Sequence, residues 1–183
     1  MKKSSVLFAF LVMTFSGMSL AEEASHEAPF SPYGYAGLGL QFASTNVNAG
    51  TAGNYSFDNS LAGLILGYRP HQNFGFEFRG YGSVTDDEIQ GVAVETNQNI
   101  ALLTRGVAPL GNYVELYGLL GFGNVEASAG GLSYNDQGLQ YGVGLAFSNG
   151  GAKHWELQVE WMKLYDDSGL EVSGVNLNAV YKL

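Results

Sequence analysis

Two carboxylates, Glu156 and Glu160, share one face of a predicted strand, and paired carboxylates can divide the acid and base roles of a hydrolytic reaction. In this chain they would point into a packed interior that offers a substrate no route. A nucleophile needs a base beside it, yet neither His71 nor His154 has a serine within two or three residues on the same face. The sequence therefore predicts no catalytic residues, no enzymatic activity and no cofactor.

The charged pair Glu77 and Arg79 lies in a stretch that alternates with a period of two, which is typical of a strand. One face is entirely aromatic, at Phe74, Phe76 and Phe78. A soluble sheet would turn these phenylalanines inward, whereas a membrane barrel directs apolar residues to lipid and polar residues into its lumen. The stretch therefore predicts a hairpin of a membrane barrel, with Glu77 and Arg79 inside.

Eight segments alternate in this way and are predicted strands: 33–42, 59–68, 74–83, 99–108, 113–123, 137–147, 154–164 and 172–183. Their lengths fit the ~9–11 residues with which a tilted strand crosses a bilayer. Long connections rich in Asn, Ser, Thr and Gly alternate with tight turns, as in barrels with external loops and periplasmic turns. A soluble lipocalin-type barrel would need polar outward faces, and these are apolar. The predicted fold is all-β: an eight-stranded antiparallel up-and-down transmembrane β-barrel over residues 33–183.

The first residues have the pattern of a secretory signal peptide. A positive start at Lys2 and Lys3 precedes an apolar core at 6–13, and small residues end the segment at Ala21. A membrane anchor helix is the alternative, but spanning a bilayer takes about 18 unbroken apolar residues and polar residues interrupt this run. The prediction is a signal peptide over 1–21, read by the general secretory route, and a flexible periplasmic tail over 22–32.

The chain has 183 residues, no cysteine and a formal net charge of −9, which becomes −11 once Lys2 and Lys3 leave with the signal peptide. The lack of cysteine excludes a disulfide framework and a lipoprotein anchor. An acidic chain is a poor partner for nucleic acid and for anionic membrane surfaces. An exported membrane protein without a long apolar helix has one structural solution, which is a closed barrel.

Three stretches carry a resemblance to a known family: GYRPHQNFGFEFRGY at 67–81, LTRGVAPLGNYVELYGLLGFG at 103–123 and LQVEW at 157–161. They resemble the OmpA-like small outer-membrane barrels, whose eight-stranded plan OmpX/Ail-type and opacity-type barrels share. The resemblance implies a monomer in the outer membrane of a Gram-negative bacterium, among lipid and lipopolysaccharide. The periplasmic peptidoglycan-binding domain of full-length OmpA-type proteins is not expected, because the chain stops at its eighth strand.

The resemblance also implies how the barrel is assembled. Periplasmic chaperones and the barrel-assembly machinery would handle the chain, reading an alternating apolar C-terminus. The residues that match this signal are Tyr181 and Leu183, although Leu183 stands where the family usually ends in Phe. We therefore expect a tolerated variant of the assembly signal.

A lumen gate is a further implication of the resemblance. In OmpA-like barrels a glutamate on the third strand pairs with basic residues on neighbouring strands and acts as a gate. The matching glutamate is Glu77, and Arg105 matches one basic partner. Glu156 stands where the family usually has an arginine, so one of the two switching partners is missing.

Charged residues are predicted to fill the lumen. Arg105 is assigned inward because a lipid-facing arginine near mid-membrane would cost ~2–4 kcal/mol. An eight-stranded barrel is just wide enough for side chains to fill it. The network then either plugs the barrel or lines a narrow, poorly selective ion path gated around Glu77 and Arg105. Its four acids and three bases are Glu77, Arg79, Arg105, Glu115, Glu156, Glu160 and Lys182.

Acidic residues crowd the predicted external loops, which contain no Lys or Arg. These acids serve solvation or bind divalent cations that link the loops to lipopolysaccharide phosphates. No dedicated metal site is predicted, because the acidic run lacks the ligand spacing of an EF-hand. Lys163, at the outer end of its strand, either faces a lipid phosphate or is solvated. The candidate cation contacts are Asp86, Asp87, Glu88, Asp166 and Asp167.

The sequence favours a structural role in envelope integrity and surface interaction, with the lumen plugged. The alternative is a low-conductance, poorly selective pore. A loop-mediated adhesin is a second alternative, which is favoured less because the loops carry few large apolar residues.

Overall fold

The computed structural model describes residues 30–48, 54–84, 88–89, 92–129, 132–148, 154–167 and 170–183. The predicted signal peptide over 1–21 and the tail up to residue 29 lie outside these ranges. No helix among the described residues is long and apolar enough to cross a membrane.

The described chain forms one antiparallel sheet that closes on itself, because the last strand pairs with the first. Neighbours in sequence pair with one another, and the third strand also pairs with the fifth. The strands are β1 (Tyr33–Asn48), β2 (Asn54–His71), β3 (Phe74–Ser83), β4 (Glu88–Ile89), β5 (Val92–Pro109), β6 (Val114–Ala129), β7 (Leu132–Ser148), β8 (Trp155–Asp167) and β9 (Leu170–Lys182).

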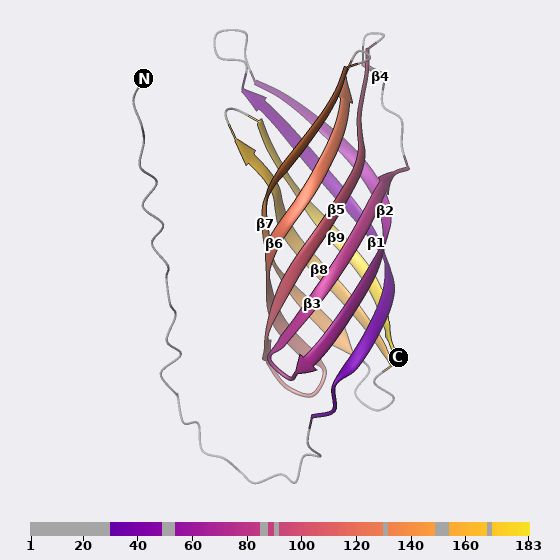
Figure 1. Cartoon of the computed structure of the whole chain (residues 1–183), viewed down its shortest axis with the longest axis vertical. Helices are drawn as coiled ribbons and strands as arrows, with labels where there is room; N and C mark the ends of the chain where they lie inside the picture. Colours follow the sequence, from indigo (N-terminus) through magenta and orange to yellow (C-terminus); the bar gives the residue numbers. More distant parts are fainter. Residues whose placement is uncertain are drawn as a thin grey trace, which may run out of the picture.

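The two-residue β4 pairs with β5 and continues the line of β3 along it. The barrel wall therefore has eight strand positions, which we call staves, and β3 and β4 share one of them. Figure 1 shows the strands tilted around a common axis, with the C-terminus at the same end of the barrel as the short turn that joins β2 and β3. We call this end of the barrel the turn end. The predicted eight-stranded up-and-down barrel is confirmed.

Most strands run further than predicted at the end away from the turn end. β1 continues to Asn48 and β2 begins at Asn54, so most of the loop predicted at 43–58 is strand. The same holds for 124–136, which lies largely in β6 and β7. The prediction of long loops there was wrong, because beyond the lipid both faces of a strand meet water. In sequence, the positions that continue the lipid face are polar there, as at Asn46, Ser56 and Glu126, so the apolar face that identifies a membrane strand is missing although the backbone ladder continues.

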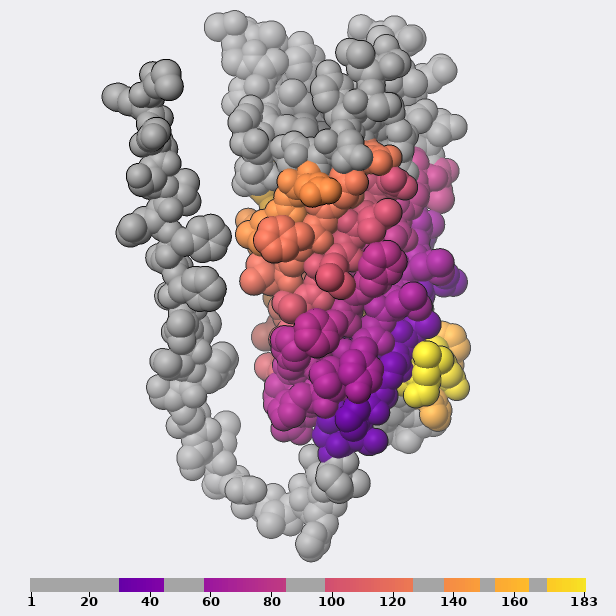
Figure 2. Space-filling model, viewed as in Figure 1, coloured from indigo at the N-terminus to yellow at the C-terminus, as the bar shows by residue number. Residues whose placement is uncertain are grey.

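The alternation inside the membrane band is confirmed strand by strand. On β3 the three phenylalanines of the predicted lipid face are exposed, while Glu77 and Arg79 are buried. On β5 Leu102 is 63% exposed and Arg105 is 2% exposed, so Arg105 points inward as predicted. Large apolar side chains cover the magenta surface of β2 and β3 in Figure 2. The barrel therefore presents apolar residues outward and polar residues inward.

Glycines on the inner face make room for tyrosines from neighbouring strands. A Cβ at Gly67 would overlap the ring of Tyr35, and a Cβ at Gly144 would lie 2.6 Å from Cζ of Tyr117. The Tyr81 ring lies in the same way against Gly63, where a Cβ would be 2.6 Å from its Cδ1. A side chain cannot approach the backbone this closely unless the position is glycine. These contacts bring the hydroxyls of Tyr35 and Tyr117 to lumen glutamates and that of Tyr81 to Asn178.

Candidate functional site

Arg79 stands at the centre of the lumen, where it binds two glutamates. Its guanidinium donates to Glu160 at 2.6 and 2.8 Å and also forms an ion pair with Glu77, two residues away on β3. β3 and β8 lie four staves apart in a barrel of eight, so the Arg79–Glu160 pair crosses the lumen from one wall to the opposite one. All three side chains are buried.

Arg105 extends this chain of charges toward the turn end. It donates to Glu77 at 3.1 Å and to Glu156 at 2.9 Å, and the second bond spans three staves, from β5 to β8. Lys182 then pairs with Glu156 at 3.4 Å. The result is one alternating series of acids and bases: Glu160, Arg79, Glu77, Arg105, Glu156 and Lys182.

Two tyrosines complete the hydrogen bonding of the glutamates. The Tyr35 hydroxyl donates to Glu77 at 2.5 Å, and the Tyr117 hydroxyl donates to Glu160 at 2.6 Å. Arg105 lies over the Tyr117 ring, with its guanidinium carbon 3.9 Å from the centroid. Hydrogen bonds to charged groups are the strong ones in proteins, so the tyrosines fix the glutamates in place.

Arg69 is a lumen residue that sequence reasoning missed. The predicted strand 59–68 stops short of Arg69, but Arg69 lies in β2, is 4% exposed and donates to Glu115 at 2.8 and 3.0 Å. Glu115 therefore forms a separate pair at the turn end instead of joining the central series. The missed signal was parity, because Arg69 follows Ile65 and Gly67 on the inward positions of the same strand.

With Arg69 included, the charges in the described part of the lumen balance. The predicted set held four acids and three bases, and the fourth base brings both to four. Each of these acids makes an ion pair with at least one of these bases. An unpaired ion in such an interior would cost about 3–5 kcal/mol, so neutrality and pairing are what a closed lumen requires.

A layer of amides lies in the lumen on the side away from the turn end. Gln41 donates to Asn176 at 3.1 Å, and Gln140 donates to Asn99 at 2.9 Å. Asn176 also donates to Glu160 at 3.1 Å, which joins the amides to the ionic series. The inward parity of these residues placed them in the lumen, but their type alone did not single them out.

Lys163 does not match either expectation for it. It forms an ion pair with Glu171 of β9 and is 8% exposed, so it is neither solvated nor open to a lipid phosphate. A register shift between β8 and β9 beside it accompanies this packing.

The candidate cation contacts of the external loops are not placed by the structure. Asp86 and Asp87 lie outside the described residues, as do the side chains of Glu88, Asp166 and Asp167. Within the described ranges, no group of three or more His, Asp or Glu side chains is arranged to hold a metal ion.

The residues of the predicted assembly signal lie at the turn end. Tyr181 faces outward and packs its ring against Trp155, with centroids 5.0 Å apart. Leu183 is exposed, and its N–H donates to the carbonyl of Gly34 at 2.9 Å. The two side chains are accessible on the outer wall of the barrel, and their recognition by an assembly factor stays a prediction.

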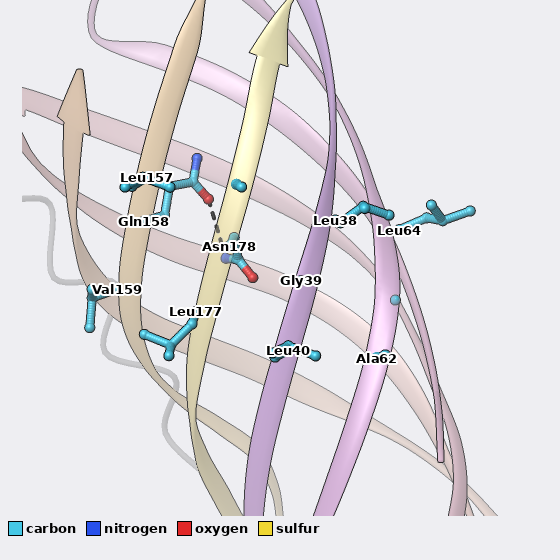
Figure 3. Close-up of a pocket in the computed structure, with 12 residues that line it drawn as sticks. Leu38, Gly39, Leu40, Ala62, Leu64, Leu157, Gln158, Val159, Leu177 and Asn178 are labelled. Atoms are coloured by element: carbon cyan, nitrogen blue, oxygen red, sulfur yellow. Dashed lines mark hydrogen bonds between the residues drawn. The ribbon is translucent and has the colours of Figure 1, made fainter. Parts of the chain in front are cut away.

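An apolar hollow of about 780 Å³ lies on the outer wall, where β8, β9, β1 and β2 run side by side (Figure 3). Its rim is formed by exposed side chains such as Leu38, Leu64 and Leu157. Behind it, Asn178 donates to Gln158 at 3.2 Å, as the dashed line shows. The hollow lies on the apolar outer wall, and its exposed lining is made of Leu, Val and Ala side chains.

A family model for the outer membrane protein beta-barrel domain matches residues 7–182, which is nearly the whole chain. The chain belongs to this outer-membrane barrel family. Short turns face the periplasm in such barrels, so the turn end is the periplasmic end. None of the curated proteins matches the sequence.

Solved structures of other outer-membrane barrels share the fold. Ail, the attachment invasion locus protein of Yersinia pestis, in complex with the heparin analogue sucrose octasulfate, matches at a TM-score of 0.56 and 22% identity, over 82% of this chain and 99% of that chain. Neisserial surface protein A matches at a TM-score of 0.60 and 13% identity, over 84% of this chain and 100% of that chain. OprG from Pseudomonas aeruginosa matches at a TM-score of 0.54 and 13% identity, over 83% of this chain and 95% of that chain. The resemblance to small eight-stranded outer-membrane barrels is thereby confirmed.

Proposed function

We propose that this outer-membrane barrel has a structural role in envelope integrity and surface interaction, and that its lumen is closed. The observation that carries the proposal is the Arg79–Glu160 pair, which joins opposite walls at the centre of the lumen. A continuous water path would have to pass this pair, the Glu77–Arg105 pair beside it and the amide layer beyond it.

Energetics support a permanent closure. Separating a buried ion pair leaves two uncompensated charges, and removing one partner of such a pair costs about 3–5 kcal/mol. Glu160 is held by Arg79, Tyr117 and Asn176 together. Opening the lumen would break these contacts in one step. A barrel whose lumen is closed in this way fits a structural role, in which its outer wall and its external surface act and no solute passes through the lumen.

The test is the conductance of the refolded mature protein in a planar bilayer. The double variant Arg79→Ala/Glu160→Ala removes the crossing pair without leaving an unpaired charge, because Glu77 keeps Arg105. We expect no current steps from the wild type and discrete steps from this variant. The matched control Arg79→Met/Glu160→Met removes the same charges but keeps side-chain volume, and it should stay silent. Steps from the wild type, once its insertion is shown by heat modifiability, would refute a closed lumen.

A low-conductance pore gated around Glu77 and Arg105 is the second candidate function. The observation that favours it is the double engagement of Glu77, which accepts from Arg105 through one oxygen and from Arg79 through the other. Glu77 could thus release Arg105 and keep a partner. Wild-type steps that change in size or lifetime in Glu77→Ala and Arg105→Ala would favour the pore.

The remaining parts of the proposal concern partners. We propose a monomer that lies among lipid and lipopolysaccharide, is assembled by the barrel-assembly machinery after export, and carries out no catalysis. Ail was solved with a heparin analogue, but binding of a sulfated sugar is not carried over. The predicted external loops of this chain contain no Lys or Arg to pair with sulfate groups.

A further inference from the structure

The periplasmic mouth of the lumen is covered by aromatic rings from the start of the described chain. Phe30 precedes β1, and its ring packs against Tyr33, with centroids 5.9 Å apart, and against His71, with centroids 6.5 Å apart. The guanidinium carbon of Arg69 lies 5.7 Å from the Phe30 centroid and 5.9 Å from the Tyr33 centroid. Two rings thus cover a cation that stands at the end of its strand.

The burial of Arg69 needs this cover. Arg69 precedes Pro70 and Gln72 at the turn, a place where an arginine would ordinarily meet water, yet it is 4% exposed. Its partner Glu115 lies three staves away on β6, and the Gln72 carbonyl at the turn accepts a further hydrogen bond from the guanidinium. The faces of aromatic rings attract cations, and more strongly where water is excluded. The rings of Phe30 and Tyr33 supply that surface.

Tyr33 also joins the mouth to the charges deeper in the lumen. Its hydroxyl accepts from Arg69 at 3.0 Å, and the ammonium of Lys182 lies 5.0 Å from its ring centroid. Lys182 is the last member of the central ionic series, through Glu156. Tyr33 therefore touches both the Arg69–Glu115 pair and the end of the central series.

We propose that Phe30 and Tyr33 form a stopper in the periplasmic mouth, held by Arg69 and Lys182, which keeps periplasmic water and solutes away from the lumen charges. The mouth is thus covered by the chain's own residues immediately before and at the start of β1. The stopper goes beyond the central plug, because it closes a different level of the lumen.

A cysteine below the stopper tests this, and the protein has no cysteine of its own. Val180 packs with Tyr35 and Ile65 in a cluster that Tyr33 covers, so Val180→Cys is the reporter. The refolded protein is treated with a charged, water-soluble maleimide. We expect Phe30→Ala to raise the labelling rate of the reporter about fivefold, the ratio that corresponds to one lost ring–cation contact.

The controls separate the stopper from a general loosening of the barrel. Ser31→Ala changes the exposed neighbour of Phe30 and should leave the labelling rate as it is. Phe30→Tyr keeps a ring and should also keep the protection. Leu61→Cys, buried elsewhere in the lumen, should label equally in every background. Equal labelling of Val180→Cys in the Phe30→Ala and Ser31→Ala backgrounds would overturn the stopper, as would a parallel rise at Leu61→Cys. Neither result depends on whether the centre of the lumen conducts.

Discussion

Substituting Gly67 by alanine should destabilise the barrel by displacing Tyr35 from the lumen wall. The new Cβ would overlap the Tyr35 ring and lie 2.5 Å from its hydroxyl oxygen. The nearest atoms belong to a side chain, so Tyr35 would rotate away and the backbone would stay. Its hydrogen bond to Glu77 would then be lost. A substitution on the barrel wall would thereby weaken the hydrogen bonding of Glu77 in the central ionic series.

The magnitude follows from three contributions. Overpacking a filled interior costs about 1–3 kcal/mol. Losing a hydrogen bond to a charged group costs about 1.5–3 kcal/mol. Replacing glycine by alanine within a strand returns about 0.5–1 kcal/mol. We therefore expect the free energy of unfolding to fall by about 2–5 kcal/mol.

Reversible urea unfolding in lipid vesicles, followed by tryptophan fluorescence, measures this change. Gly106→Ala is the matched control, because Gly106 faces outward on β5 and its built Cβ meets nothing within 4 Å. This control should be neutral or slightly stabilising. In a Tyr35→Ala background, Gly67→Ala should cost nothing further. An equal effect of Gly67→Ala and Gly106→Ala, or an undiminished cost without the Tyr35 ring, would refute the reasoning.

Three further predictions test other parts of the barrel. Arg69→Ala should lower the free energy of unfolding by about 1–3 kcal/mol, less than for a fully buried pair because Glu115 is partly exposed; Arg69→Ala/Glu115→Ala should recover part of it, and no recovery would count against the pair. Leu102→Cys should react with a lipid-soluble maleimide and Leu103→Cys should not; the reverse order would invert the phase of β5. Phe78→Lys should cost about 2–4 kcal/mol in urea unfolding, and a change below about 1 kcal/mol would place this side of β3 outside the hydrocarbon.

Alternation was sufficient to predict the inner and outer faces because lipid tolerates few polar side chains. On β3 the phenylalanines had to face the lipid and the charged residues the lumen. On β5 the need to keep Arg105 out of the lipid decided which residues face inward. Which charges meet was not predictable in the same way. Arg79 and Glu160 come together from opposite walls because the strands are staggered around the barrel, and alternation along one strand contains no measure of stagger. The ends of β1 and β2 escaped prediction because the positions that continue their lipid face are polar beyond the membrane, as at Asn46 and Ser56.

The missing base could nevertheless have been found by counting. A closed lumen with four acids and three bases would hold one carboxylate without a partner, which would cost several kcal/mol. After Lys2 and Lys3, three basic residues remain outside the predicted lumen set: Arg69, Lys153 and Lys163. Lys153 lies in a predicted turn, and Lys163 shares the outward parity of Trp161. Arg69 alone shares the inward parity of Gly67, so neutrality and parity together select it, and the structure places it against Glu115.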